Sequence, residues 1–233
     1  MHKSLIGLFL LFAILFVPQC ITVPAMYETA EAKQEKRAGI SAQYGRGTYK
    51  GLCESTKYNY KYGGLRVDYG NVKEYGKLIE AGYELGASVN GFDETSEDAN
   101  YYNRGMILQM DGRLTGKIVT PTTPVRLGLK VAPGLLLYGG INQRNGEFDG
   151  GVEIGSLFYS SFLLGIGNPE FLTVVYHCYP FPYYPAGPYY SFLSLTYHHE
   201  EYSITAGGLL PIGHNNDIET PKYHFTLGLG IHY

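Results

Sequence analysis

The residues with the clearest potential for chemistry lie close together in the last quarter of the chain. They are His198, His199, Glu200, Glu201 and Ser203. A histidine and a carboxylate could activate the serine as a nucleophile, or the two histidines could bind a metal ion. Adjacent strand residues point to opposite faces, however, and no third ligand follows at a suitable spacing. The pattern therefore predicts a polar turn with no catalytic and no metal-binding residues.

Two more histidines, His224 and His232, lie on the polar face of the last apolar segment, too far apart along a strand to form one catalytic unit. The chain contains no Gly-x-Ser-x-Gly motif, no phosphate-binding loop and no paired-cysteine metal motif. The sequence predicts a protein that is not an enzyme and that needs no cofactor.

Many charged residues alternate with apolar residues along extended segments. Glu80 and Glu84, for example, lie between Ile79, Tyr83 and Leu85. A period of two places one set on each face of a strand. In a membrane barrel the apolar set would contact lipid and the charged set would line the lumen. The predicted lumen-lining residues are Arg66, Asp68, Glu80, Glu84, Asp111, Arg113, Arg126, Lys130, Glu147, Asp149 and Glu153.

The elements that would position these residues are ten candidate strands separated by Gly, Asn, Pro and Asp. Long or irregular connections alternate with mostly shorter ones, as in transmembrane barrels, and an even strand count returns both ends of the chain to one side. Because 124–166 is long for two strands, eight or twelve strands remain alternatives. The predicted strands are 38–46, 58–70, 76–89, 104–116, 124–140, 146–166, 170–178, 189–198, 201–211 and 222–233.

The last strand favours a membrane barrel over a secreted soluble barrel, in which the same alternation would point the apolar set inward. Every second residue from Tyr223 to Tyr233 is apolar or aromatic, with His, Thr and Gly between them. This pattern resembles the closing strand of the small bacterial outer-membrane β-barrel family. The resemblance implies an all-β, antiparallel up-and-down barrel in the bacterial outer membrane, in contact with lipid and inserted by the barrel-assembly machinery. The implied insertion signal is Phe225, Leu227, Leu229, Ile231 and Tyr233.

The beginning of the chain resembles an export signal. A basic start precedes a thirteen-residue apolar run from Leu5 to Val17, which is too short for a membrane helix but suits a signal peptide. Cleavage after Ala25 is the favoured outcome, and lipidation at Cys20 is the alternative. We therefore divide the chain into a signal peptide at 1–25, a flexible lead-in at 26–37 and a barrel at 38–233.

Composition agrees with this class. The 233 residues include 31 Gly and 23 Tyr, no Trp, and 17% charged residues with a net charge of −3. Such a balance offers no basic patch for nucleic acid. Tyrosines at strand ends suit the interfaces of a membrane. Cys53 and Cys178 remain after export and could form a disulfide if their loops meet.

Three interpretations of the lumen follow from its predicted lining. The favoured one is an ion-paired filling, since about eight strands already leave only enough room for side chains. The second is a narrow pore whose acidic excess prefers cations. The third is a lumenal site for a small ligand.

The segment 179–188 places four prolines among aromatic residues, so it should be stiff and should display its rings outward. Contact with an external partner and contact with the lipid boundary are equally compatible with it. The predicted contact residues are Phe181, Tyr183 and Tyr184. Taken together, the sequence favours a structural or surface-contact role over a porin, and a porin over a lipid-modifying enzyme.

In one predicted hairpin the outward-facing residues of the two strands do not fall opposite each other in simple pairing. Outward residues are odd-numbered at Val125 to Val131 but even-numbered from Phe148 onward, and simple pairing was expected to join odd to odd. We therefore expect a β-bulge at Pro133-Gly134 that turns Leu136 outward, and an ion pair between Lys130 and Glu153.

Overall fold

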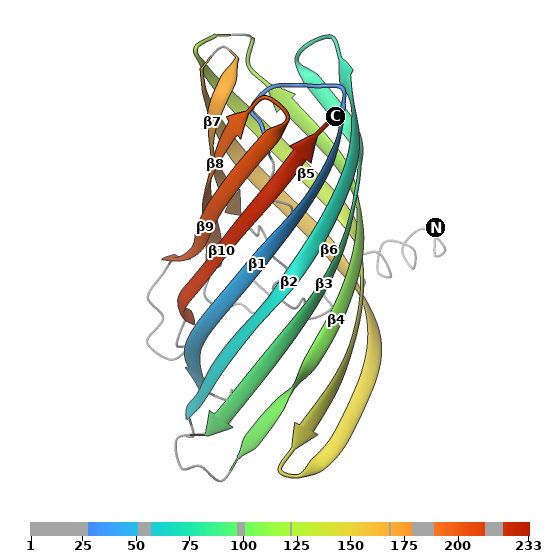
Figure 1. The fold of residues 1–233 in the computed structure, drawn as a ribbon, viewed down its shortest axis with the longest axis vertical. Helices are drawn as coiled ribbons and strands as arrows, with labels where there is room; N and C mark the ends of the chain where they lie inside the picture. Colours follow the sequence, from blue (N-terminus) through green and yellow to red (C-terminus); the bar gives the residue numbers. More distant parts are fainter. Residues whose placement is uncertain are drawn as a thin grey trace, which may run out of the picture.

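The computed structural model describes residues 28–50, 57–96, 101–121, 123–167, 169–178, 189–212 and 221–233, and within them the chain is a closed antiparallel barrel of ten strands (Figure 1). Each strand pairs with its neighbours in sequence, and β1 pairs with β10 to close the wall. The strands are β1 (Glu35–Lys50), β2 (Lys57–Tyr75), β3 (Ile79–Ser96), β4 (Tyr102–Val119), β5 (Val125–Arg144), β6 (Glu147–Gly167), β7 (Glu170–Cys178), β8 (Tyr189–His199), β9 (Tyr202–Ile212) and β10 (Pro221–His232).

The predicted fold and the count of ten strands are confirmed. Several strands are longer than predicted, because Gly and charged residues that were taken as ends of strands continue the ladder. β3, for instance, runs on through Asn90, Gly91 and Asp93 to Ser96. Within the part of the chain that the structure describes, no helix is long and apolar enough to cross a membrane.

The two faces of the wall show which way the barrel is turned. Along β3 the outward residues Ile79, Tyr83 and Leu85 are exposed, while the inward Glu80 and Glu84 are buried. β10 repeats the pattern. Its outward residues Phe225, Leu227, Leu229, Ile231 and Tyr233 are all exposed. A soluble barrel would bury the apolar set, so a wall that buries its charges and displays its apolar residues is built for lipid.

The two ends of the barrel differ. The short connections that follow β2, β6 and β8 lie at the same end as the start of β1 and the end of β10. Because transmembrane barrels keep short turns on the periplasmic side, we call this the periplasmic end and the opposite one the outer end. Strands β2 to β6 have 18 to 21 residues, against 9 to 12 for β7 to β10. The wall therefore rises much higher on one side of its outer end (Figure 1).

The predicted bulge at Pro133 is wrong. β5 and β6 are joined by the two-residue turn Asn145-Gly146, both with positive φ, which pairs Arg144 with Glu147. Such a turn joins even positions to odd ones, so the outward sets match without any shift of register. The pairing of β5 with β6 continues unbroken through Pro133, and Leu136 faces inward and is fully buried.

The predicted ion pair between Lys130 and Glu153 is wrong for the same reason. Lys130 reaches into the lumen toward Glu28 and Glu84. Glu153 lies far along β6 toward the outer end, where it accepts a hydrogen bond from the hydroxyl of its pairing partner Tyr138.

Replacing Leu229 with arginine tests the orientation of the wall. Leu229 is exposed on the outer face and pairs with Ile40 and Ile204, which are exposed beside it. We expect the free energy of unfolding in lipid vesicles, measured by urea titration, to fall by about 2–4 kcal/mol, because the substitution places a charge against lipid. Tyr233→Arg, at the end of the strand, serves as the control and should cost about 0–1 kcal/mol. Equal costs at both positions would contradict the orientation.

Candidate functional site: a charged lumen and the segment that enters it

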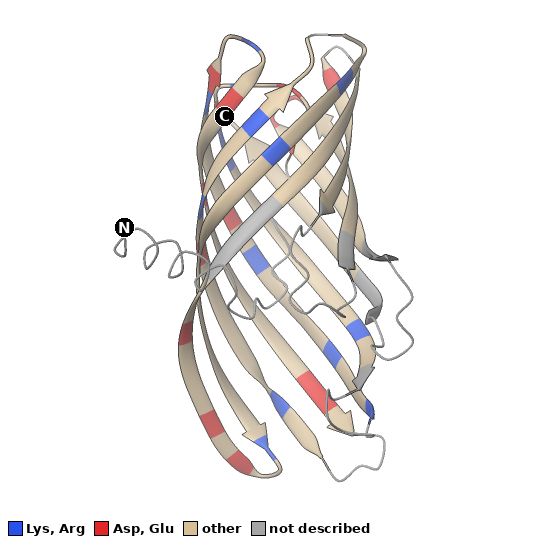
Figure 2. Cartoon of the chain, turned by 180° about the vertical axis from the view of Figure 1, so that it is seen from behind, with Lys and Arg blue, Asp and Glu red and all other residues tan. Residues whose placement is uncertain are grey.

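The inner face of the barrel carries buried charges of both signs in equal number. Charged positions are distributed along the length of the strands (Figure 2). Among the described residues, six basic and six acidic side chains are buried, and all of them lie inside the barrel. They are Arg37, Arg66, Arg113, Lys117, Arg126 and Lys130, with Glu28, Asp68, Glu80, Glu84, Asp111 and Glu170.

Four of these residues form one compact group across β2 and β4. The guanidinium of Arg66 lies 2.7 Å from Asp68 and 2.7 Å from Asp111, and that of Arg113 lies 3.2 Å from each of the same carboxylates. Two planar cations thus share two anions, so each of these buried charges lies beside charges of the opposite sign.

A glycine on the inner face provides the space for this group. A Cβ atom built at Gly86 would lie 1.9 Å from Nη2 of Arg66 and 2.9 Å from Asp111. Any larger residue there would displace a guanidinium whose partners surround it. Gly86 is therefore part of the construction of the charged group.

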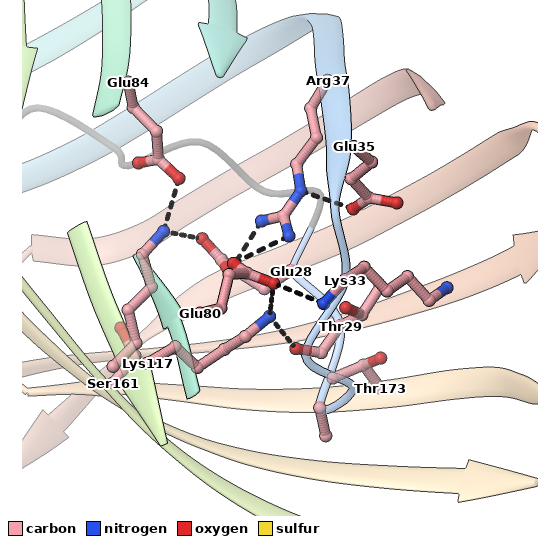
Figure 3. A network of polar contacts seen from close by, with 12 residues as sticks. Glu28, Thr29, Lys33, Glu35, Arg37, Glu80, Glu84, Lys117, Ser161 and Thr173 are labelled. Carbon is pink, nitrogen blue, oxygen red and sulfur yellow. Dashed lines mark hydrogen bonds and ion pairs between the residues drawn. The ribbon is translucent and has the colours of Figure 1, made fainter. Parts of the chain in front are cut away.

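A second group lies closer to the periplasmic end and joins β1, β3, β4 and β5 (Figure 3). Glu80 accepts from Arg37 at 2.9 Å and from Lys117 at 2.7 Å. Glu84 lies 2.5 Å from Lys130 and 3.6 Å from Arg113, so it connects this group with the first. Glu28, which pairs with Lys130 on β5 and lies beside Arg37 on β1, joins these ion pairs into one continuous network.

The segment 28–34, which precedes β1, enters the lumen and completes this second group. The Glu28 carboxylate pairs with Lys130 and lies 3.6 Å from Arg37. The Lys117 ammonium donates to the carbonyl oxygen of Thr29 at 3.0 Å, and the backbone N–H of Lys33 donates to Glu80 at 3.1 Å. Figure 3 shows these contacts. β1 begins at Glu35, within the range 26–37 expected as a flexible lead-in, and the described residues from Glu28 onward pack inside the barrel.

A further set of contacts holds the segment on the side of β5 to β7. The backbone N–H of Ala30 donates to Glu170 at 2.9 Å, and Arg126 lies 2.8 Å from Glu31. Ala30 is fully buried against Leu163 and Val175, in a small apolar patch on the inner wall. Charge pairing and apolar contact therefore act together on the segment.

Gly165 on β6 makes room for it. A Cβ atom built there would lie 2.4 Å from Oε2 of Glu170 and 2.7 Å from the Cβ atom of Ala30. The wall is thus shaped to receive the segment.

The protonation of Glu28 follows from its neighbours. Burial alone would raise the pKa of its carboxyl group, but the positive charges of Lys130, Arg37 and Lys117 together hold that pKa below its usual value. Glu28 is therefore ionised at neutral pH.

The predicted lumen residues fall into two sets. Arg66, Asp68, Glu80, Glu84, Asp111, Arg113, Arg126 and Lys130 lie buried in the network. Glu147, Asp149 and Glu153 are exposed, because they lie in the part of β6 that extends beyond the point where β7 pairs. Phe181, Tyr183, Tyr184 and Cys53 lie outside the described residues, as does the side chain of Cys178.

Sequence reasoning missed Glu28, Arg37, Lys117 and Glu170. Lys117 continues the every-second-residue pattern of Asp111 and Arg113. Extending the predicted strand beyond residue 116 would therefore have included it. Arg37 and Glu170 lie at strand ends, where the alternation is too short to be recognised. No pattern in the sequence marks Glu28.

The histidines and serines of the wall contact one another in pairs. His232 Nε2 lies 3.0 Å from Ser203 Oγ, and His232 Nδ1 lies 3.4 Å from Glu35. This order of groups is that of a hydrolase triad, but Ser203 is 1% exposed and offers no room for a substrate carbonyl. His198 bonds to Thr173 at 2.8 Å, and His199 is exposed on the opposite face. Within the described ranges no cluster of three or more His, Cys, Asp or Glu could hold a metal ion.

Known proteins resemble this chain in fold but not in sequence. No family model matches the chain, and no curated protein matches it in sequence. The transport unit of the autotransporter AIDA-I from Escherichia coli superposes with a TM-score of 0.54 and 10% identity, over 86% of this chain and 90% of that one. The translocator domain of the autotransporter NalP from Neisseria meningitidis superposes with a TM-score of 0.46 and 11% identity, over 86% of this chain and 89% of that one. Ail, the attachment invasion locus protein of Yersinia pestis, superposes with a TM-score of 0.29 and 13% identity, over 85% of this chain and 99% of that one.

At these identities the likeness concerns the fold alone. The structural neighbours are bacterial outer-membrane β-barrels, and fold similarity supports the same location for this chain.

Proposed function

We propose that this chain is a closed outer-membrane barrel that acts as a scaffold and makes its functional contacts at the outer end. The observation that carries the proposal is the network of buried ion pairs that spans the lumen and includes Glu28 from the segment preceding β1. Solvated ions would need to separate these pairs in order to pass, and separating a buried pair costs several kcal/mol.

The balance of charge argues against the cation-preferring pore. A pore lined by acids attracts cations only if their charge is uncompensated. Here six buried acids face six buried bases, and each of the six acids lies within 4 Å of at least one basic nitrogen. The acidic excess predicted from the sequence came from Glu147, Asp149 and Glu153, which lie outside this network.

The outer end offers a surface suited to contact. The rings of Tyr58 and Tyr101 pack edge to face with their centroids 5.2 Å apart, and the Cζ atom of Arg144 lies 5.1 Å from the centroid of the Tyr101 ring. Close by along β2, the rings of Tyr60 and Tyr62 stack with their centroids 6.3 Å apart. Tyrosine and arginine are among the residues enriched at the centres of protein interfaces. By the alternation of β2 and β5, this Tyr/Arg cluster lies on the inner face of the high side of the wall, at its outer end.

Retention of cells on surfaces tests the contact role. Cells producing the full chain should remain on immobilised extracellular-matrix protein under flow at least several-fold longer than cells without it. The double substitution Tyr101→Ser/Arg144→Ser should remove most of this difference, because it dismantles the cluster. Tyr202→Ser, at the periplasmic end, is the matched control and should retain it. Equal retention with and without the protein would overturn the proposed contact role.

A further inference from the structure

The outer face of the high wall contains a hollow of about 750 Å³ near its outer end. One cross-strand row of outward residues forms its base: Tyr44 pairs with Gly63, Gly63 with Gly91, Gly91 with Met106, and Met106 with Ile141. Large apolar side chains flank the row on both sides, whereas its centre has no side chains at all. The result is an apolar depression in the surface that faces lipid.

A charged row follows two residues further toward the outer end. Arg46 pairs with Lys61, Lys61 with Asp93, Asp93 with Arg104, and Arg104 with Gln143. On the side toward the membrane, the next row contains Leu65, Val89 and Leu108, all exposed and apolar. The charged row therefore marks the outer boundary of the apolar belt, directly above the hollow.

The charged row carries three basic groups and one acidic group. Lys61 lies 3.0 Å from Asp93, and both side chains are partly exposed. Arg104 donates to Gln143 at 3.4 Å and lies 5.3 Å from the Tyr102 ring. Asp93 can compensate only one of the three cations, so the row retains a net positive charge at the depth of the lipid head groups.

We propose that this hollow binds a phosphate-bearing lipid of the outer leaflet, with an acyl chain over Gly63 and Gly91 and the phosphate at Lys61 and Arg104. The shape and the charge are complementary to such a molecule. An acyl chain can fill the apolar depression, whose centre has no side chains. A phosphate at the charged row, two residues closer to the outer end, can accept hydrogen bonds from the basic groups there. The inference is independent of whether the lumen conducts ions.

The glycines allow the hollow to be filled without disturbing the wall. A Cβ atom built at Gly91 would meet nothing closer than 3.9 Å, and one at Gly63 nothing closer than 3.5 Å. Gly91→Leu should therefore occupy the hollow and leave the strands in place. Gly116→Leu on β4 provides a matched control, because a Cβ atom there also has space, with 3.8 Å to its nearest neighbour, near the periplasmic end.

Native mass spectrometry of the refolded full chain in detergent, titrated with purified lipid A, tests the proposal. We expect one tightly retained lipid A on the unmodified chain and on Gly116→Leu. Retention should fall at least tenfold for Gly91→Leu and for Lys61→Gln/Arg104→Gln, and dephosphorylated lipid A should also bind at least tenfold more weakly. The second variant keeps the test decisive if Gly91→Leu does not fold.

Equal retention by all variants, or equal binding of the dephosphorylated lipid, would overturn the proposal. Displacement of lipid A by an equal concentration of inorganic phosphate would also overturn it, because the hollow would then contribute nothing. None of these three results would bear on the closed lumen, which is tested separately by conductance.

Discussion

Replacing Lys130 with methionine is expected to lower the free energy of unfolding by about 3–5 kcal/mol, because the change leaves two buried carboxylates without their shared cation. Lys130 lies 2.5 Å from Glu84 and also pairs with Glu28, and all three side chains are buried. Urea titration in lipid vesicles, followed by the mobility shift of the folded barrel, would measure the loss.

Lys61→Met is the control for that substitution. Lys61 also forms an ion pair, at 3.0 Å to Asp93, but its side chain is 60% exposed. Exposed pairs contribute about 0–1 kcal/mol, so the control should be nearly silent. If Lys130→Met were no more costly than Lys61→Met, the buried network would not be what stabilises the lumen.

Replacing Gly165 with leucine is expected to expel the segment 28–34 from the lumen. The new side chain would occupy the positions now taken by Ala30 and by the Glu170 carboxylate. A cysteine introduced as Ala30→Cys reports the change, since Ala30 is fully buried in the intact barrel. Its reaction with a water-soluble maleimide should be at least tenfold faster in the Gly165→Leu background.

Gly112→Leu, on the outer face of β4, is the matched control for a bulky substitution at a wall glycine, because a Cβ atom there meets only the Leu85 side chain at 3.4 Å. It should leave the Ala30→Cys thiol protected. If the Ala30→Cys thiol reacted equally fast in the otherwise unmodified chain, with Gly165→Leu and with Gly112→Leu, the segment would not be held in the lumen.

The wall of this barrel could be predicted from the sequence because its physical requirement is local. Each strand must present apolar residues to lipid at every second position, and this rule is visible in β3 and β10 without knowledge of their neighbours. The number of strands followed from counting such segments. The inward charges of the middle strands, such as Glu84 and Arg113, followed from the same alternation.

The register of the β5–β6 hairpin could not be predicted in this way. Whether odd residues pair with odd or with even ones depends on the length of the turn. The predicted loop 141–145 ended at Asn145 and assigned Gly146 to the next strand, so the two-residue turn Asn145-Gly146 was not recognised. Asn-Gly between apolar strands is a strong signal for a two-residue turn, so this error was avoidable.

The entry of the segment 28–34 into the lumen could not have been predicted from its own residues. Glu28 and Glu31 stand in a charged stretch without periodicity, which is the composition of a solvated tail. What draws the segment inward is a set of basic residues on two strands far along the chain, Lys117 on β4 and Arg126 and Lys130 on β5. Only the closed barrel brings these side chains together around one segment.

Conductance across a planar lipid bilayer tests the closed lumen most directly. The refolded full chain should insert without discrete current steps, since its buried cations and anions are paired across the lumen. Gly165→Leu, in which the segment is expelled, should open to small steps and so show that inserted barrels can be detected. Discrete, cation-selective steps from the unmodified chain would contradict the closed lumen and would favour a pore instead.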